Sequence, residues 1–395
     1  MENKLPNGWI NTTLADVGII ITGITPSKNV KSYYTGGSIP FVKPPDLGKT
    51  LPVVQASDNL TEEGYRNAKP IPKNSIMVCC IGSLGKIGIA GRELATNQQI
   101  NSISFDTNKV EFKFGYYYAL TLEKYMNSVA NKAVVAIINK SSFSKFPFPL
   151  PPLPEQHRIV AKLDSLFERT DQAIALVEQN IANAKHLMAS VLNDAFDGLD
   201  CNKKSLDSIC QIIGGGTPKT NINEYWDGDI IWLSPTDLPP IGEIAYVSNS
   251  SNTITKLGLA KSSARLLPKG SIVFSSRASI GKIGITEIEL STNQGFTNFI
   301  CNQGVNNIYL AYALKRYTPE ISALSNSTTF AEVSKTNFRA FQIPLPTQDI
   351  QERISDFLQR MQYKYDSLVS ANKVRLAALQ ALKSSFLDSA FKGEL

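Results

Sequence analysis

The chain has 395 residues, of which 43% are hydrophobic and 19% are charged, with 40 Lys and Arg against 34 Asp and Glu. This length leaves room for two or three domains, and the composition is typical of a soluble protein with a packed core. Five cysteines without a Cys-x-x-Cys pair and only two histidines exclude a disulfide framework and a zinc site. No apolar run reaches about 18 residues and the first residues do not resemble a signal peptide, so a cytoplasmic protein is expected.

Positive charge is concentrated in two globular segments. Residues 1–153 carry 16 basic and 10 acidic side chains, and residues 200–348 carry 13 basic and 11 acidic ones. The stretches that follow them are close to neutral or acidic. Residues 154–199 carry 4 basic and 7 acidic side chains, and residues 349–395 carry 7 basic and 6 acidic ones. A polyanion is therefore expected to contact the chain through the globular segments.

The first globular segment alternates short β-branched or apolar runs with polar turns. The runs have the length of strands and end at Gly, Pro or Asn, and one stretch in each globular segment has helical composition. Both globular segments are therefore predicted to be α+β. Strands are expected at residues 17–21, 76–81, 86–90 and 99–105, and helices at residues 115–131 and 308–318.

A long helix is predicted after the first globular segment. Residues 155–196 contain neither Pro nor Gly, and apolar residues recur there every three or four positions, which places them on one face of a helix. About forty residues at about 1.5 Å each give a rod of roughly 60 Å. A rod of this length with one apolar stripe needs a second long helix to lie against.

The C-terminal stretch supplies a second copy of that helix. Gln156 and Arg158 match Gln351 and Arg353, and the offset stays at 195 residues from the preceding prolines to the end of the helix. The first helix is assigned to residues 154–199 and the second to residues 349–395.

The globular segments are also two copies of one unit. Three blocks recur in the same order, and the third is identical at ten of fourteen positions. The blocks are LADVGIIITGITPSK (14–28) with LDSICQIIGGGTPKT (206–220), IPFVKPPDL (39–47) with IIWLSPTDL (230–238), and GKIGIAGRELATNQ (85–98) with GKIGITEIELSTNQ (281–294).

Catalytic motifs are missing from this sequence. Residues 82–86 have the wrong spacing for a P-loop, and no hydroxyl residue follows the lysine. Neither the tetrad of an adenine methyltransferase nor a nuclease carboxylate pattern occurs. The residues therefore predict no catalytic site and no metal site, and an unrecognised enzyme is a remote possibility.

Together these motifs resemble a known family over the whole chain. They are the LPNGW start at residues 5–9, the paired Gly-x-Thr-Pro segments, the paired Gly-Lys-Ile-Gly to Thr-Asn-Gln blocks, and the Pro-Leu-Pro to Gln-x-Arg-Ile starts of the helices. The chain resembles the DNA specificity subunit of type I restriction-modification systems. That resemblance implies a non-catalytic subunit with two target recognition domains and two antiparallel spacer helices, related by a pseudo-two-fold axis.

The resemblance also implies what this chain binds. Each domain would read one half of a bipartite DNA site, and the half-sites would lie about one helical turn, ~34 Å, apart. The helices would bind modification subunits, which methylate adenine, and restriction subunits would complete the assembly. S-adenosylmethionine, ATP and Mg²⁺ are expected only on those partners. The alternative is a coiled-coil interaction scaffold whose globular domains bind protein or RNA.

Side chains in polar, loop-like sequence are the candidates for DNA contact. Hydroxyl and lysine groups suit phosphate oxygens, and an aromatic ring can stack on a base or pack against sugar. A solvated loop or a core edge is the alternative explanation for each of them. The candidates are Thr25, Lys28, Lys31, Tyr33, Lys43, Ser83 and Lys86 in the first domain, and Thr217, Lys219, Tyr225, Trp226, Arg277, Ser279 and Lys282 in the second.

One difference between the domains is of the kind that unequal half-sites require. Arg277 could bind guanine bidentately, whereas the equivalent position in the first domain holds Ile81. Asn97-Gln98 and Asn293-Gln294 could bind adenine, but identical residues are poor at reading different sequences. A structural turn role is therefore favoured for these two pairs.

Apolar residues outside the main stripe of each helix suggest an outside partner. A purely intramolecular coiled coil, or packing on the globular domains near the helix ends, is the competing explanation. The candidate partner-binding residues are Val160, Phe167, Met188, Leu192, Phe196, Phe357, Leu387 and Phe391.

Overall fold

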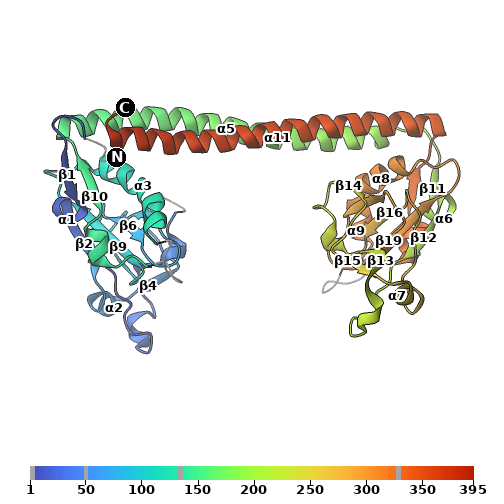
Figure 1. Ribbon diagram of the computed structural model, residues 1–395, viewed down its shortest axis with the longest axis horizontal. Coiled ribbons are helices and arrows are strands. Elements are labelled where there is room, and N and C mark those ends of the chain that lie inside the picture. Colours follow the sequence, from blue (N-terminus) through green and yellow to red (C-terminus); the bar gives the residue numbers. More distant parts are fainter. Residues whose placement is uncertain (1–4, 49–51, 131–136, 326–330) are drawn as a thin grey trace. The chain divides into compact units, whose positions relative to one another are not determined.

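The computed structural model describes residues 5–48, 52–130, 137–325 and 331–395. It contains two compact units (Figure 1), the first formed by Met1–Glu178 with Lys373–Leu395 and the second by Gln179–Asn372. Each unit therefore combines one globular domain with part of both long helices.

The first unit holds two four-stranded sheets and a two-stranded ribbon. The sheets have the strand orders β2-β9-β6-β7 and β4-β3-β8-β5, and β1 pairs with β10. All pairs are antiparallel except β3 with β8. The elements are β1 (Ile10–Thr13), α1 (Leu14–Val17), β2 (Gly18–Thr22), η1 (Lys31–Tyr33), β3 (Ile39–Val42), η2 (Pro44–Asp46), β4 (Asp58–Leu60), α2 (Glu62–Arg66), β5 (Pro70–Ile71), β6 (Ile76–Cys79), β7 (Ile87–Ile89), β8 (Leu94–Thr96), β9 (Ile100–Phe105), α3 (Phe112–Ala130), α4 (Lys140–Ser144), β10 (Pro147–Leu150) and the start of α5 (Leu153–Asp197).

The second unit repeats this plan. Its sheets have the orders β12-β19-β16-β17-β14 and β15-β13-β18, and β11 pairs with β20. The elements are β11 (Lys203–Ser205), α6 (Leu206–Ile209), β12 (Cys210–Gly214), η3 (Asn223–Tyr225), β13 (Trp226–Leu233), η4 (Pro235–Asp237), β14 (Ile244–Val247), β15 (Asn252–Ile254), α7 (Lys256–Ala260), β16 (Ile272–Ser275), β17 (Ile283–Thr286), β18 (Ser291–Thr292), β19 (Phe296–Cys301), α8 (Asn307–Arg316), α9 (Thr318–Ala323), α10 (Lys335–Ala340), β20 (Gln342–Pro344) and α11 (Gln348–Lys392).

These elements confirm the predicted α+β class. The four strands expected in the first domain correspond to β2, β6, β7 and β9, and the two expected helices correspond to α3 and α8. Residue 131, the predicted end of the first of these helices, lies outside the described residues. Both long helices are continuous over 45 residues.

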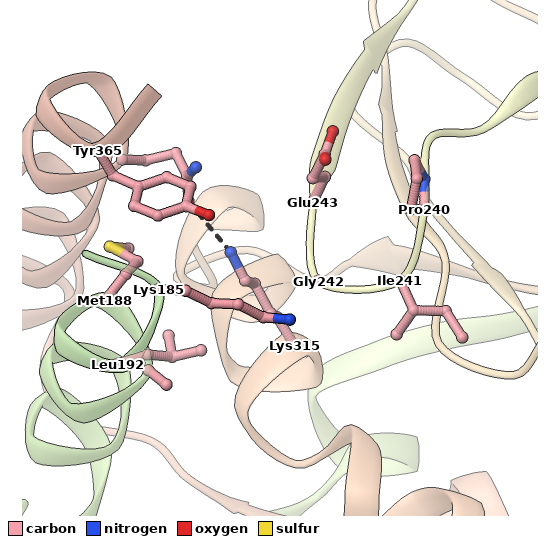
Figure 2. A pocket seen from close by; sticks show the side chains of 11 residues that line it. Lys185, Met188, Leu192, Pro240, Ile241, Gly242, Glu243, Lys315 and Tyr365 are labelled. Atoms are coloured by element: carbon pink, nitrogen blue, oxygen red, sulfur yellow. Dashed lines mark hydrogen bonds between the residues drawn. The ribbon is translucent and has the colours of Figure 1, made fainter. Parts of the chain in front are cut away.

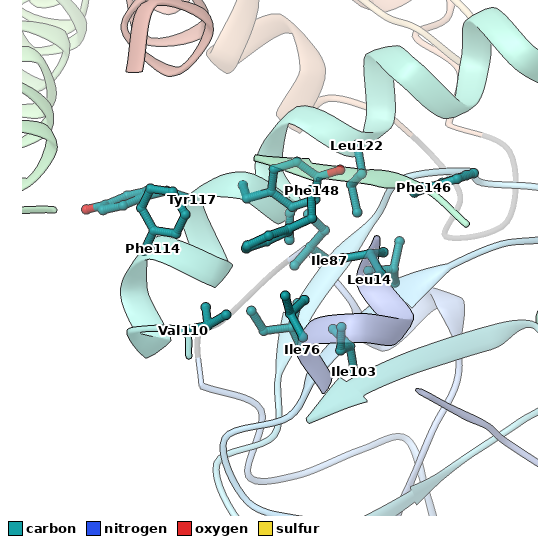
Figure 3. Packing of buried hydrophobic residues seen from close by; sticks show 14 of the residues in the cluster. Leu14, Ile76, Ile87, Ile103, Val110, Phe114, Tyr117, Leu122, Phe146 and Phe148 are labelled. Atoms are coloured by element: carbon teal, nitrogen blue, oxygen red, sulfur yellow. The ribbon is translucent and has the colours of Figure 1, made fainter. Parts of the chain in front are cut away.

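The main core of the first unit lies between the sheet β2-β9-β6-β7, α3 and the long helices (Figure 3). Phe148 of β10 is fully buried, with its ring centroid 6.0 Å from that of Phe114 and 4.6 Å from that of Tyr118. Burying a side chain of this size stabilises the fold by about 1.5–3 kcal/mol. This core therefore holds the globular domain firmly against the helices.

The helices α5 and α11 pack antiparallel within each unit. In the first unit Ile159, near the start of α5, shares a core with Leu387, near the end of α11. In the second unit Phe196, at the end of α5, shares a core with Leu358, near the start of α11. The predicted pairing of the two helices is thus confirmed.

A buried glutamine fixes the start of each long helix to its globular domain. Gln156 accepts a hydrogen bond from the Glu111 N–H at 2.8 Å and donates to the Lys109 carbonyl at 2.8 Å. Gln351 makes the same contacts with Asn306 N–H, at 2.9 Å, and the Gly304 carbonyl, at 3.2 Å. Because a buried amide without partners is costly, these contacts explain why a glutamine stands at the same position near the start of both helices.

Within the described ranges, no helix is both long enough and apolar enough to cross a membrane.

Candidate nucleic-acid interface

Three loops meet at one end of the main sheet in each unit, and we call this arrangement the loop junction. It consists of the Gly-x-Thr-Pro loop, the β6–β7 or β16–β17 hairpin turn, and the Asn-Gln turn that precedes β9 or β19. These loops comprise residues 23–26, 80–86 and 97–99 in the first unit, and residues 215–218, 276–282 and 293–295 in the second.

The first glycine of each Gly-x-Thr-Pro loop lies directly against another backbone segment. The Gly23 N–H donates to the Ile100 carbonyl at 3.1 Å, and a Cβ at this position would collide with Thr96. The Gly215 N–H donates to the Phe296 carbonyl at 3.3 Å and has equally little space beside it. Only glycine permits such close approach, so this residue shapes the loop in both units.

The threonine of the same loop binds the glutamine of the Asn-Gln turn. The Thr25 hydroxyl donates to Gln98 Oε1 at 2.5 Å, and the Thr217 hydroxyl donates to Gln294 Oε1. Two sequence blocks that recur in both domains therefore contact each other in space. Both threonines, predicted to contact DNA, already have partners within the chain.

The hairpin turn is attached to the same place. The Cys80 N–H donates to the Gln99 carbonyl at 2.7 Å, and the Ser276 N–H donates to the Gly295 carbonyl at 2.8 Å. Asn97 and Asn293 accept a hydrogen bond from the backbone N–H two residues later, at 3.1 and 2.8 Å. Their side chains have the structural turn role favoured from the sequence.

The Pro-x-Asp-Leu block is held by its aspartate. Asp237 accepts hydrogen bonds from the backbone N–H of Ser234, at 2.8 Å, and of Ser251, at 3.2 Å, and from both hydroxyls. Burial acts to raise the pKa of Asp237, but these hydrogen bonds outweigh it and hold the pKa below its usual range. Asp46 accepts from the Lys43 and Ser57 N–H groups in the same way.

Two of the predicted lysine contacts are engaged within the chain. Lys43 forms an ion pair with Asp58. Lys282 Nζ donates to the carbonyls of Pro235 at 2.7 Å and Leu238 at 3.1 Å, so it holds the 3-10 turn η4 in place. These contacts compete with phosphate binding by either ammonium group.

Most of the other predicted polar contacts are exposed at or beside the loop junction. An exposed lysine is free to approach a phosphate, and an exposed Ser or Arg can reach a base edge. The exposed candidates are Lys28, Lys31, Ser83, Lys86, Lys219, Arg277 and Ser279.

Of the three predicted aromatic contacts, Trp226 lies at the edge of a small core. Trp226 is half-buried, its ring centroid is 5.0 Å from that of Trp232, and its Nε1 donates to the Lys219 carbonyl at 3.1 Å. Tyr33 and Tyr225 are also half-buried. The core-edge explanation therefore describes the packing of Trp226.

A fourth repeated block escaped the sequence comparison. Thr61 and Thr255 cap the short helices α2 and α7, and each also donates to the carbonyl of the residue before Tyr33 or Tyr225, at 2.8 Å. The block reads LTEEG at residues 60–64 and ITKLG at residues 254–258. Thr and Gly stand three residues apart in both copies. This shared spacing was the signal in the sequence that could have revealed the block. In each unit α2 or α7 lies at the end of the domain away from the long helices (Figure 1).

Most of the candidate partner-binding residues are packed inside their own unit. Packing near the helix ends, the competing explanation, describes these side chains, whereas Phe357 is 42% exposed. The packed residues are Val160, Phe167, Leu387 and Phe391 in the first unit and Met188, Leu192 and Phe196 in the second.

A cavity of about 430 Å³ lies beside α5 and α11 in the second unit (Figure 2). Met188 and Leu192 of α5, Tyr365 of α11 and Ile241 form much of its wall. Lys315 of α8 points into it, and its Nζ donates to Gln362 Oε1 at 3.1 Å. Burial lowers the pKa of Lys315, against the opposing effect of Asp366 and Glu243.

Among the described residues, no group of three or more His, Cys, Asp and Glu side chains is placed to hold a metal ion.

Comparison with solved structures supports this fold. A chain solved in a study of complex assembly and conformational transition of the type I R-M system matches with a TM-score of 0.79 at 21% identity, covering 99% of this chain and 100% of that chain.

Sequence comparison finds relatives among the specificity subunits of type I restriction enzymes. The chain is 35% identical over 199 residues to the type I restriction enzyme MjaIX specificity subunit of Methanocaldococcus jannaschii, which covers 49% of this chain and 46% of the relative. It is 27% identical over 280 residues to the type I restriction enzyme EcoR124I/EcoR124II specificity subunit of Escherichia coli, which covers 68% of this chain and 66% of that relative. The chain thus spans about half the length of the first relative and just under two thirds of the second.

The model of one protein family matches both halves of the chain. It is described as the type I restriction modification DNA specificity domain, and it matches residues 6–182 and 199–374. Each match contains one complete loop junction and most of one long helix. The chain therefore belongs to the type I restriction-modification DNA specificity family.

Proposed function

We propose that this chain is the non-catalytic specificity subunit of a type I restriction-modification complex and recognises an asymmetric bipartite DNA site with one domain per half-site. The observation that carries the proposal is the loop junction. One frame of hydrogen bonds occurs in both units, and different exposed side chains surround it.

The hydrogen-bonded frame of the loop junction and the exposed side chains around it have separate roles in this proposal. Residues identical in both units, such as Thr25 and Thr217 with their glutamine partners, bind each other and hold the loops. Exposed lysines such as Lys28, Lys31 and Lys219 supply charge for phosphate contacts, which position a protein on DNA without reading sequence. Sequence is then read by exposed residues that differ between the units.

The long helices are proposed to dock the modification subunits, with restriction subunits completing the complex. Apolar side chains that stay exposed on a helix are suited to packing against another helix. S-adenosylmethionine, ATP and Mg²⁺ belong to the partners in this proposal. The large apolar side chains exposed on α5 and α11 include Leu176, Leu187, Phe357, Leu368, Val374 and Leu382.

Methylation of DNA by the chain together with its modification subunit tests the proposal. We expect adenine methylation at one asymmetric bipartite sequence, mapped across a whole genome. Methylation at many unrelated sequences would reject the proposal. Salt-sensitive duplex binding without sequence preference, with the modification subunit present, would favour the interaction scaffold instead.

A further inference from the structure

One position of the loop junction carries opposite chemistry in the two units. In the second unit Arg277 of the hairpin turn forms an isolated antiparallel β-bridge with Glu332, and in the first unit Ile81 forms the same bridge with Ile137. The positions are equivalent because each follows the residue whose N–H binds the Asn-Gln turn. The strand opposite is also attached alike: the Ile138 N–H donates to the Cys80 carbonyl at 2.9 Å, and the Val333 N–H donates to the Ser276 carbonyl at 3.0 Å.

Three of the four side chains at this bridge are presented to solvent, and the fourth, Ile81, is half-buried. Arg277 Nε lies 2.7 Å from Glu332 Oε1, and both side chains are 47% exposed. In the first unit Ile137 is 55% exposed. Each unit therefore displays a matched pair of side chains at the same place, one pair charged and the other apolar.

The shape of the turn is maintained between the units even where it is strained. Ala278 has a φ of 57°, and the equivalent Gly82 has a φ of 77°. A residue with a Cβ adopts this left-handed conformation only at a cost of about 1–2 kcal/mol. The turn therefore has one geometry in both units, and the difference between them lies in the side chains that it presents.

We propose that this bridge is a specificity-determining position, at which Arg277 and Glu332 read a G·C pair and Ile81 and Ile137 read a thymine methyl group. The inference deepens the proposed function and rests on it. In the major groove guanine presents two acceptors, and the cytosine amino group presents a donor beside them. An adjacent donor and acceptor on the protein complement that order, whereas an aliphatic pair complements the methyl group of thymine.

A purely structural role explains the ion pair less well. An exposed ion pair contributes about 1 kcal/mol or less. The turn is also held by backbone hydrogen bonds, among them Ala278 N–H to the Ala331 carbonyl at 3.1 Å. The first unit keeps the same bridge without any charged side chain, so the fold of the turn does not require the pair.

The test replaces the charged pair by the apolar pair of the other unit. The variant R277I/E332I leaves the net charge of the chain unchanged, so phosphate attraction is preserved. With the modification subunit present, methylated sequences are recovered from a plasmid library that carries randomised half-sites. We expect the preference for G·C at one base pair of one half-site to fall by about ten- to hundredfold. The other half-site and the salt dependence of binding should stay as in the wild type.

The reciprocal variant I81R/I137E should change one base pair of the other half-site only. Variants R277Q and E332Q remove one charge each while keeping a polar side chain, and serve if the double substitution reduces folding, which thermal unfolding monitors. Half-sites identical to the wild type in well-folded variants would overturn the inference, as would an equal loss of preference at every position. A wild-type complex that methylates no defined bipartite sequence would instead reject the proposed function itself.

Discussion

Arg316 of α8 donates hydrogen bonds to both carboxylate oxygens of Asp197, the last residue of α5, at 2.9 and 3.0 Å. It also donates to Glu320 at 3.1 Å, and its side chain is only 17% exposed. A planar guanidinium held in this way ties the second globular domain to the end of its spacer helix. If the specificity subunit is to place its domains on DNA, such a tie limits rotation of the domain about the helix.

Replacing Arg316 by Ala should lower the free energy of unfolding by about 1.5–3 kcal/mol, because it removes the charged hydrogen bonds from Nη2 to Asp197 and from Nη1 to Glu320. Urea unfolding of the full chain measures this change. The control is R339A, since the pair of Arg339 with Asp207 is 55% and 61% exposed and should contribute less than about 1 kcal/mol. Equal effects of the two variants would contradict the expectation.

Lys315 is a half-buried cation whose ammonium group donates a hydrogen bond to the side-chain amide oxygen of Gln362. The equivalent position of the first domain, 195 residues earlier, holds Leu120. We expect K315L to raise the unfolding temperature at neutral pH, because burial of the charged lysine is unfavourable in the folded state. The exposed Lys364 provides the control variant K364L, for which no such rise is expected.

The pH dependence of K315L has a defined sign. The pKa of Lys315 in the folded state lies below its ordinary value of 10.5. At pH values below the folded pKa the lysine is charged in both states, so the whole free-energy cost of burying the charge destabilises the wild type. It disappears as the pH rises through the folded pKa toward the ordinary value. The stabilisation of K315L relative to the wild type should therefore shrink at alkaline pH, and a stabilisation that grows with pH would contradict this account.

The repeat could be read from the sequence because its identical residues build the frame. Gln156 and Gln351 recur at one offset because each satisfies buried backbone groups at the start of a helix. Gly23 and Gly215 recur because no side chain fits beside the crossing strand. Residues of this kind tolerate little change, so they stay aligned when the surface around them differs.

Other features depend on contacts between residues far apart in the chain. Lys282 was expected to face DNA, but its ammonium group binds carbonyls more than forty residues earlier, which no local pattern indicates. Strands of two to four residues, such as β5 and β18, are too short for an alternating pattern to show. The bridge of Arg277 with Glu332 likewise joins residues that nothing in the sequence places together.

Lys28 and Lys31 are exposed on the loop that follows the junction of the first unit and are expected to contact phosphates. The variant K28Q/K31Q should weaken binding of all duplexes alike and reduce the slope of log affinity against log salt by about 1.8. Fluorescence anisotropy with specific and unrelated duplexes measures both quantities. The control K73Q/K269Q removes the same charge from the turns that precede β6 and β16, at the other end of each sheet, and should leave the slope unchanged. A loss of sequence preference in K28Q/K31Q would assign these lysines a base-reading role instead.

Phe357 of α11 is 42% exposed, unlike the other apolar residues that were candidates for partner contact. The variant F357S should weaken capture of the modification subunit, because a buried aromatic contact in the complex would be lost, while the unfolding temperature of the free chain changes little. Capture of the purified modification subunit by immobilised full-length chain measures the effect. Ile19 of β2 is 71% exposed on the globular domain, so I19S is a matched control for loss of an exposed apolar side chain. If I19S weakens capture as much as F357S does, the modification subunit docks elsewhere or both effects are non-specific; normal capture by F357S would remove Phe357 from the docking surface.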